Sequence, residues 1–371
     1  MTNSSPTTRR VLRVLLIVAI IYIALLIGQP AGLDLVKIGD DIANNPGSIL
    51  QQLIIGLANG AIVTIIAMGY TMVYGIIELV NFAHGEVFML GTFVSLVFVA
   101  LFSTTTALGG QTAPLWAALL GFIPAMLFCG LLNAGIERAA YRRLRTQPKL
   151  VALISAIGVS FILTNVGLQL GALGKLPAIS PIFKSLSILG LNNAAPKSFP
   201  VILSNANVLG DFPIRLTQAD VLVMVVALAL VTALTWFVQN TKLGKAMRAT
   251  AQNRDAAAMM GIDVDQIITL TFLIGGALAG AAGMMSGLYN GTMVFTMGFT
   301  AGLRSFTAAV LGGIGNITGA ALGGVLIGLL AAFSDQYLSA RWTNAWVFLI
   351  LVLVLLIRPT GILGQEGGEK A

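Results

Sequence analysis

The sequence predicts an all-α, polytopic integral membrane protein, and three observations lead to that fold class. Of the 371 residues, 57% are hydrophobic and only 9% are charged, whereas soluble chains carry about 25% charged residues. The mean hydropathy is +0.92. The apolar residues also fall in runs of about 20, the length that spans a bilayer as a helix. So little charge cannot cover a water-exposed surface, which excludes a soluble enzyme, a disordered chain and a fibrous protein.

The first predicted element is an apolar run at residues 11–28, which follows a short arginine-containing segment. A basic flank before an apolar run occurs in signal peptides and in anchor helices alike. The run is long for a signal peptide and no clear small-x-small cleavage site follows it. We therefore favour a retained helix, while a cleaved signal stays open. Residues 29–47 are mixed and indicate a short external segment, so residues 1–47 form a predicted extension.

Seven further apolar runs predict helices that cross the bilayer. Each is close to the length of ~20 residues that the hydrocarbon core requires, and with the first run the prediction is about eight full spans. The predicted spans are residues 49–77, 86–105, 114–136, 150–174, 219–238, 264–290 and 343–357.

The apolar stretch 299–333 is interrupted by glycines. Its break contains Gly312, Gly313, Gly315 and Asn316, and the residues before the break are too few to span. We expect a re-entrant pair of half-helices that enters and leaves by the same face. Non-helical backbone at membrane depth is tolerated only where protein or a water-filled cavity surrounds it. These four residues are therefore candidate pathway or hinge residues.

A second interruption lies at residues 75–86 and contains Asn81, His84, Gly85 and Glu86. Ionisable groups inside a span are costly and normally face the interior of a bundle or a cavity. Three roles stay open for these candidate residues: a structural role at a helix end, the lining of a pathway, or proton relay or metal binding. The two interrupted segments are loosely similar, as in the paired broken helices of transporters, although chance similarity also accounts for this.

The basic residues orient the predicted helices. Arginines and lysines gather in two short connections, at residues 138–149 and 242–254, which predicts that both connections are cytoplasmic. The longest connection, about 175–218, is then external. The net charge of +7 does not indicate nucleic-acid binding, because no basic face with interleaved aromatics occurs. The single cysteine, Cys129, forms no intrachain disulfide, and we predict no metal site.

The cytoplasmic stretch at about 239–263 predicts a short amphipathic helix or helix pair. Alanines and methionines recur there at helical spacing, flanked by charges, and Gly261 has the position of a C-cap. This segment has too little apolar area to fold alone, so it needs membrane lipid or a partner protein. No phosphate-binding loop motif occurs in the chain. Energy for any transport must therefore come from an ion gradient or from another subunit.

Several motifs of this chain resemble those of the LivH-type permeases of branched-chain amino acid ABC importers. They follow one another in order from about residue 51 to residue 364, which is most of the chain. The motifs are Gln51-Gln52-Leu53, Gly69-Tyr-Thr-Met-Val-Tyr-Gly-Ile76, Asn81-Phe-Ala-His-Gly-Glu86, Ala152-Leu-Ile-Ser-Ala-Ile-Gly158, Phe306-Thr-Ala-Ala-Val-Leu-Gly-Gly-Ile-Gly315 and Pro359-Thr-Gly-Ile-Leu-Gly364.

The resemblance implies a multi-pass permease of the bacterial inner membrane that is not an enzyme and holds no cofactor. It implies four kinds of partner: a second, LivM-like permease, two ATPase subunits that bind the ATP, an external solute-binding protein, and lipid. Residues 48–364 would be the permease domain and residues 365–371 a C-terminal tail. The implied ATPase-coupling loop contains Gly244, Arg248, Ala249, Ala257, Gly261 and Ile262.

The sequence departs from the family pattern at three places. Residues 1–47 extend beyond the usual family start, Glu78 stands where a glycine is common, and residues 175–218 match weakly. The substrate is therefore the least determined property, with branched-chain or other neutral amino acids expected and urea, short amides or sugars as alternatives. An ion-coupled secondary transporter, with Glu78, His84 and Glu86 as ion sites, and an intramembrane enzyme are the alternatives from other classes.

Overall fold

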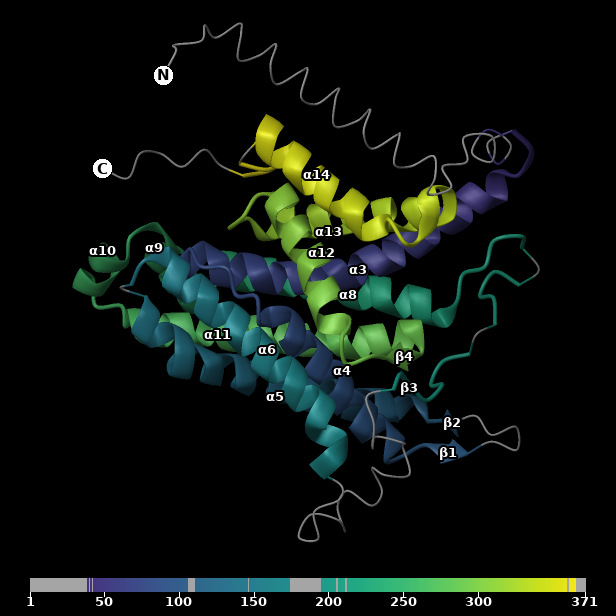
Figure 1. Cartoon of the computed structure of the whole chain (residues 1–371), viewed down its shortest axis with the longest axis horizontal. Coiled ribbons are helices and arrows are strands. Elements are labelled where there is room, and N and C mark those ends of the chain that lie inside the picture. Colours follow the sequence, from purple (N-terminus) through teal and green to yellow (C-terminus); the bar gives the residue numbers. More distant parts are fainter. Residues whose placement is uncertain are drawn as a thin grey trace, which may run out of the picture.

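The structure is a computed structural model that describes residues 39, 41, 43–105, 111–145, 147–173, 195–204, 206–210, 212–358 and 360–364. The predicted helix at 11–28, the C-terminal tail and much of the predicted external connection lie outside the described residues. The described chain is a bundle of long helices (Figure 1). Two short helices, α9 and α10, lie at one end of the bundle, and two pairs of very short strands lie at the other.

The helices follow the predicted apolar runs closely. Three short irregular turns extend two of them: a π-helix at Glu137–Tyr141 and a 3-10 helix at Arg142–Leu144 follow one helix, and a π-helix at Asp335–Ser339 follows another. The α-helices are α3 (Pro46–Ile77), α4 (His84–Ala100), α5 (Leu115–Ile136), α6 (Lys149–Leu173), α8 (Gln218–Asn240), α9 (Lys242–Gln252), α10 (Arg254–Met259), α11 (Val264–Asn290), α12 (Met297–Gly312), α13 (Ile317–Ser334) and α14 (Thr343–Ile357).

Six helical segments in the described part of the chain are long and apolar enough to cross a membrane. They begin at Pro46, Leu115, Leu150, Gln218, Val264 and Ile317. Helices α4 and α14 are apolar but shorter, with 17 and 15 residues. The prediction of an all-α polytopic membrane protein is therefore confirmed, although lengths alone do not establish the predicted count of about eight spans.

Two antiparallel strand pairs lie at the end of the bundle away from α9 and α10 (Figure 1). Strand β1 (Thr104–Thr105) pairs with β2 (Gln111–Thr112), and β3 (Lys197–Ser198) pairs with β4 (Thr292–Met293). The β3–β4 pair joins the predicted external connection to the segment after α11. It therefore ties that connection to the core of the bundle.

Glycines allow the central helices to approach closely. Where α3 crosses α13, a Cβ added to Gly328 would lie 2.2 Å from the Cα of Gly60, and one added to Gly324 would lie 2.6 Å from the Cα of Thr64. Apolar side chains gain little from packing together in lipid, so helices there associate through small residues that bring their backbones together. This accounts for the abundant glycine of the sequence.

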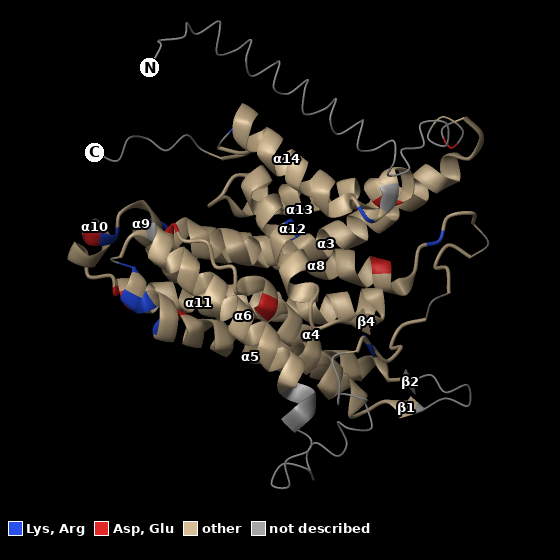
Figure 2. Cartoon of the chain, in the orientation of Figure 1, with Lys and Arg blue, Asp and Glu red and all other residues tan. Residues whose placement is uncertain are grey.

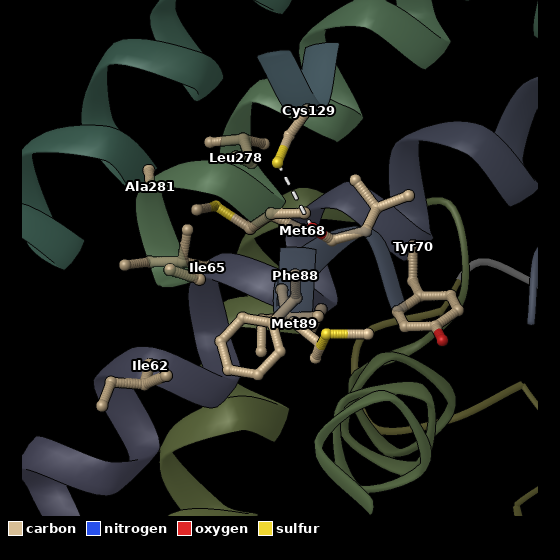
Figure 3. Packing of buried hydrophobic residues seen from close by; sticks show 14 of the residues in the cluster. Ile62, Ile65, Met68, Tyr70, Phe88, Met89, Cys129, Leu278 and Ala281 are labelled. Carbon is tan, nitrogen blue, oxygen red and sulfur yellow. Dashed lines mark hydrogen bonds between the residues drawn. The ribbon is translucent and has the colours of Figure 1, made fainter. Parts of the chain in front are cut away.

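The core lies where α3, α4, α5 and α11 meet (Figure 3). Ile65, Met68 and Phe88 are almost completely buried there. Cys129 is also buried, and its Sγ donates a weak hydrogen bond to the carbonyl oxygen of Val87 at 3.3 Å. Cys129 is therefore a small packing residue, in agreement with its position inside an apolar run.

The predicted break in 299–333 is present, but its two pieces are longer than half-helices. Helix α12 has 16 residues and α13 has 18, and α13 with the following π-helix is long enough to span. The two helices form a tight hairpin, in which a Cβ added to Gly312 would lie 2.0 Å from the carbonyl oxygen of Gly319. Small residues along both helices permit this close antiparallel packing, which the count of residues before the break did not reveal.

Candidate functional site

The chain breaks between α3 and α4 in a segment that turns back into the bundle. Helix α3 ends at Ile77, and Glu78 takes a left-handed conformation with φ 54° while its N–H donates to the carbonyl oxygen of Tyr74 at 2.8 Å. Helix α4 begins at His84, whose ring lies 4.7 Å from that of Tyr70, centroid to centroid. Tyr70 lies about two turns before the end of α3, so α4 starts inside the bundle.

Asn81 anchors this break to α5 and the turns that follow it. Its amide nitrogen donates to Oδ1 of Asn133 at 3.2 Å, and its Oδ1 accepts from the hydroxyl of Tyr141 at 2.9 Å. The nitrogen of Asn133 donates in turn to the carbonyl oxygen of Phe272 on α11 at 2.6 Å. Asn81 and Tyr141 are buried, so this satisfied network fixes the break in one position.

His84 and Glu86 lie in the first turn of α4, with only 1% and 2% of their surfaces exposed. Neither ring nitrogen of His84 has a hydrogen-bond partner among the described residues, nor has Oε2 of Glu86. The other oxygen, Oε1, accepts from the hydroxyl of Ser160 on α6 at 3.4 Å. Polar groups buried without partners are costly, so His84 and Glu86 stay candidate pathway residues beside the structural alternative.

Glycines on neighbouring helices make room for this pair. A Cβ added to Gly69 on α3 would lie 2.5 Å from Nε2 of His84, and one added to Gly298 on α12 would lie 2.3 Å from Oε2 of Glu86. Gly85 itself packs against the backbone of α12 at Gly298 and Gly302. The start of α4, directly after the break, therefore packs closely against the start of α12.

The second break, between α12 and α13, lies beside the end of α3. Gly313 and Gly315 have φ values of 104° and 92°, which residues other than glycine rarely adopt. A Cβ added to Gly75 on α3 would lie 3.3 Å from the Cα of Gly315. Asn316 caps α13 by accepting from the N–H of Gly319 at 3.0 Å, and its nitrogen donates to the carbonyl oxygen of Leu363 at 2.9 Å.

The structure thus brings both predicted interrupted segments together, although their asparagines act differently. Asn316 caps a helix, whereas α4 has Ala83 at its N-cap and no side-chain cap. The internal repeat therefore stays a prediction. In the described part of the chain, no group of three or more His, Cys, Asp or Glu residues is placed to hold a metal ion.

The predicted amphipathic segment forms two capped helices, α9 and α10. The hydroxyl of Thr241 accepts from the N–H of Gly244 at 3.0 Å, and Oδ1 of Asn253 accepts from the N–H of Ala256 at 3.0 Å. Gly261 has φ 82°, and the N–H of Ile262 donates to the carbonyl oxygen of Ala257 at 3.1 Å. The structure therefore confirms the predicted C-cap at Gly261.

The predicted coupling residues divide between the two faces of this helix pair. Gly244 and Ala257 are buried, Ala249 and Ile262 are half-buried, and Arg248 and Gly261 are exposed. Ala257 packs inward and so contributes no exposed apolar surface. The exposed apolar surface is instead Met259 and Met260, with 82% and 84% exposure.

Two connections at this end were not predicted. The guanidinium of Arg254, at the start of α10, donates to the carbonyl oxygen of Ile76 on α3 at 2.8 Å. Glu137 is completely buried and pairs with Arg145, which also donates to Asp265 on α11 at 2.6 Å. The sequence signal that could have indicated the second connection was the presence of acidic residues, Glu137 and Asp265, close to the basic clusters. A cavity of about 820 Å³ separates α9 and α10 from the end of α3.

Basic residues gather at the α9–α10 end of the bundle (Figure 2). Arg145 of the first cluster and Arg254 of the second line the same cavity. The described part therefore places the two clusters at one end, as the predicted orientation requires.

Comparison with known proteins bears directly on this fold and site. The family described as "Branched-chain amino acid transport system / permease component" matches residues 52–357. The chain belongs to this family. The family resemblance inferred from the motifs is thereby confirmed.

The similar proteins are permeases. The high-affinity branched-chain amino acid transport system permease protein LivH of Salmonella typhimurium is 40% identical over 322 residues, which cover 86% of this chain and 97% of that protein. LivH of Escherichia coli is 39% identical over the same shares. BraD of Pseudomonas aeruginosa is 38% identical, again over 86% of this chain and 97% of its own. No match to a solved structure was found.

Membership of this family gives the chain its class. It is a multi-pass inner-membrane permease component of a transport system and not an enzyme.

Proposed function

We propose that the chain is the permease subunit of an ATP-driven importer of branched-chain or other neutral amino acids. The observation that carries this proposal is the 40% identity with LivH of Salmonella typhimurium over 86% of the chain. Urea, short amides and sugars are disfavoured as substrates, because the similar proteins are described as branched-chain amino acid permeases. An ion-coupled transporter would not need the capped helix pair at the end of the bundle.

The proposed importer contains further subunits. A second, related permease would complete the membrane part, two ATPase subunits would bind ATP, and an external solute-binding protein would deliver the amino acid. The chain has no phosphate-binding loop motif of its own. ATP would therefore act on this subunit only through a docked partner, and this subunit would need no cofactor.

Helices α9 and α10 are the proposed dock for the ATPase. Methionine side chains adapt to irregular grooves, and Met259 and Met260 present such side chains beyond the bundle. Arg248 is exposed on α9, so its charge is available to acidic groups at the rim of a partner's groove. Side-chain caps at Thr241 and Asn253 stabilise the starts of α9 and α10.

Arg254 would transmit the partner's motion to the membrane. Its hydrogen bond to Ile76 joins the start of α10 to the last turn of α3, directly before the break that leads to His84 and Glu86. A helix pair that moves with the ATPase would therefore displace the segment between α3 and α4. We propose that this movement opens and closes the pathway, with His84 and Glu86 lining or supporting it.

The dock is tested by replacing both exposed methionines with glutamate. Met259→Glu/Met260→Glu should leave insertion unchanged, because both side chains lie outside the packed structure, but should abolish co-purification of the ATPase and uptake of leucine. Val208→Glu/Leu209→Glu is the matched control, since these side chains are 53% and 47% exposed in the predicted external connection. Normal uptake and a stoichiometric ATPase in the methionine variant would exclude this dock.

A further inference from the structure

A cavity of about 430 Å³ lies among α3, α4, α11, α12, α13 and the start of α14. It begins near the β3–β4 end of the bundle, where Asn290 and Thr292 line it, and reaches Ile66 and Phe88 in the core. Its volume falls in the range of about 300–1,000 Å³ that is typical of small-molecule sites. It is separate from the cavity beside α9 and α10.

One cation, Arg304, lines this cavity from the middle of α12. Its Nε donates to Oδ1 of Asn344 at 2.9 Å, and within the described residues it forms no ion pair. Asp335 acts on it through space, but that carboxylate accepts a hydrogen bond from Thr343 instead. Arg304 is half-buried, and a charge that is partly removed from water is costly unless it is paired. A bound anion would supply that pairing.

The other lining residues carry no charge, and they include both polar and apolar side chains. The amide groups of Asn59, Asn290 and Asn344 are polar, whereas Ile62, Ile66 and Phe88 are apolar. A guanidinium, asparagine amide groups and an apolar wall are the groups that a neutral amino acid requires: a donor pair for its carboxylate, acceptors for its ammonium group and a surface for its side chain.

We propose that this cavity is a binding subsite for a neutral α-amino acid, with Arg304 as the residue that binds the carboxylate. The proposal rests on the proposed function and extends it to named residues. The fork of the guanidinium can hold both carboxylate oxygens, while Asn344 orients it through Nε. Ile62, Ile66 and Phe88 receive the aliphatic side chain. Once the carboxylate of the ligand occupies Arg304, the wall formed by Ile62, Ile66 and Phe88 offers no charged partner to the ligand's side chain, which disfavours charged amino acids.

The test uses the purified transporter with its partner subunits but without the solute-binding protein, so that only the membrane part selects the ligand. L-leucine should raise the thermal unfolding temperature of the wild-type complex, whereas leucinol, which lacks the carboxylate, should not. Arg304→Gln should abolish the shift caused by leucine. In the complete system, it should raise the KM for leucine by at least about tenfold, the loss expected for one charge-assisted interaction.

Arg341→Gln is the matched control, because Arg341 is exposed and does not line the cavity. It should leave both measurements unchanged. If Arg304→Gln fails to insert, Arg304→Lys keeps the charge but loses the fork, and it should still raise the KM. An unchanged KM and leucine shift in a folded Arg304 variant overturn the subsite.

Failure of the subsite and failure of the proposed function give different results. A wild-type complex that imports no leucine contradicts the proposed function itself. Wild-type import together with normal import by the Arg304 variant contradicts only the subsite. A stabilising shift that depends on Arg304 and arises with phosphatidylglycerol vesicles, but not with leucine, assigns the site to a lipid headgroup and overturns the proposal.

Discussion

The absence of a side chain at Gly69 leaves room for the ring of His84. An added Cβ at Gly69 would lie 2.5 Å from Nε2 of His84, and a rigid imidazole ring cannot yield as a flexible chain would. Gly69→Ala should therefore destabilise the protein by roughly 1–3 kcal/mol, the usual cost of overpacking. Thermal unfolding in detergent measures this. Gly158→Ala, on α6 with open space around it, should leave stability unchanged or slightly raised.

The same contact provides a double-variant test. In a His84→Ala background the ring is absent, which removes the two shortest contacts of a methyl group at Gly69 and leaves the carbonyl oxygen of Gly275 at 3.1 Å. Gly69→Ala should therefore cost less stability in that background than in the wild type. Equal costs in the two backgrounds would show that His84 does not require the space at Gly69.

The backbone conformation at Glu78, where the sequence departs from the family pattern, gives a physical reason why a glycine suits this position. Glu78 is the one residue other than glycine with a positive φ in the described part of the chain, at 54°, and this conformation costs an L-residue about 1 kcal/mol or more. Glu78→Gly should therefore be more stable than Glu78→Ala by about 1 kcal/mol. Both variants lose the carboxylate, so the comparison isolates the backbone. Equal unfolding temperatures would show that the positive φ carries no such cost.

At the scale of elements, the α12–α13 hairpin depends on the turn at Gly313. This residue combines φ 104° with a close contact, because an added Cβ would lie 2.3 Å from the backbone nitrogen of Gly364. Gly313→Leu should insert but lose most uptake. Gly315→Ala shares the positive φ, but an added Cβ would meet only the Cα of Gly75 at an ordinary contact distance of 4.0 Å, so it should retain most uptake. The measurement is uptake normalised to the amount of protein in the membrane, and equal uptake by the two variants would exclude a special role for Gly313.

For the whole molecule, composition and hydrophobic runs were sufficient to predict the class and most helix boundaries, because burial in lipid demands long apolar helices. The breaks were also visible, since Gly313 and Gly315 interrupt an apolar run. What could not be predicted was which side chains meet. Arg254 contacts Ile76, which lies 178 residues away, and Arg304 lines a cavity made by six helices. Such contacts depend on how the helices cross, which periodicity does not encode.

The orientation of the whole molecule follows from charge and remains to be measured. The basic clusters at the α9–α10 end predict that this end is cytoplasmic, and residues 195–218 should then be external. Met260→Cys and Val208→Cys place exposed thiols at the two ends, while the native Cys129 is fully buried and should not react. In intact cells, a membrane-impermeant maleimide should label Val208→Cys at once. It should label Met260→Cys only after the membrane is permeabilised, because α10 is predicted to be cytoplasmic. The reverse pattern would place α9 and α10 outside the cell, beyond the reach of any ATP-hydrolysing partner.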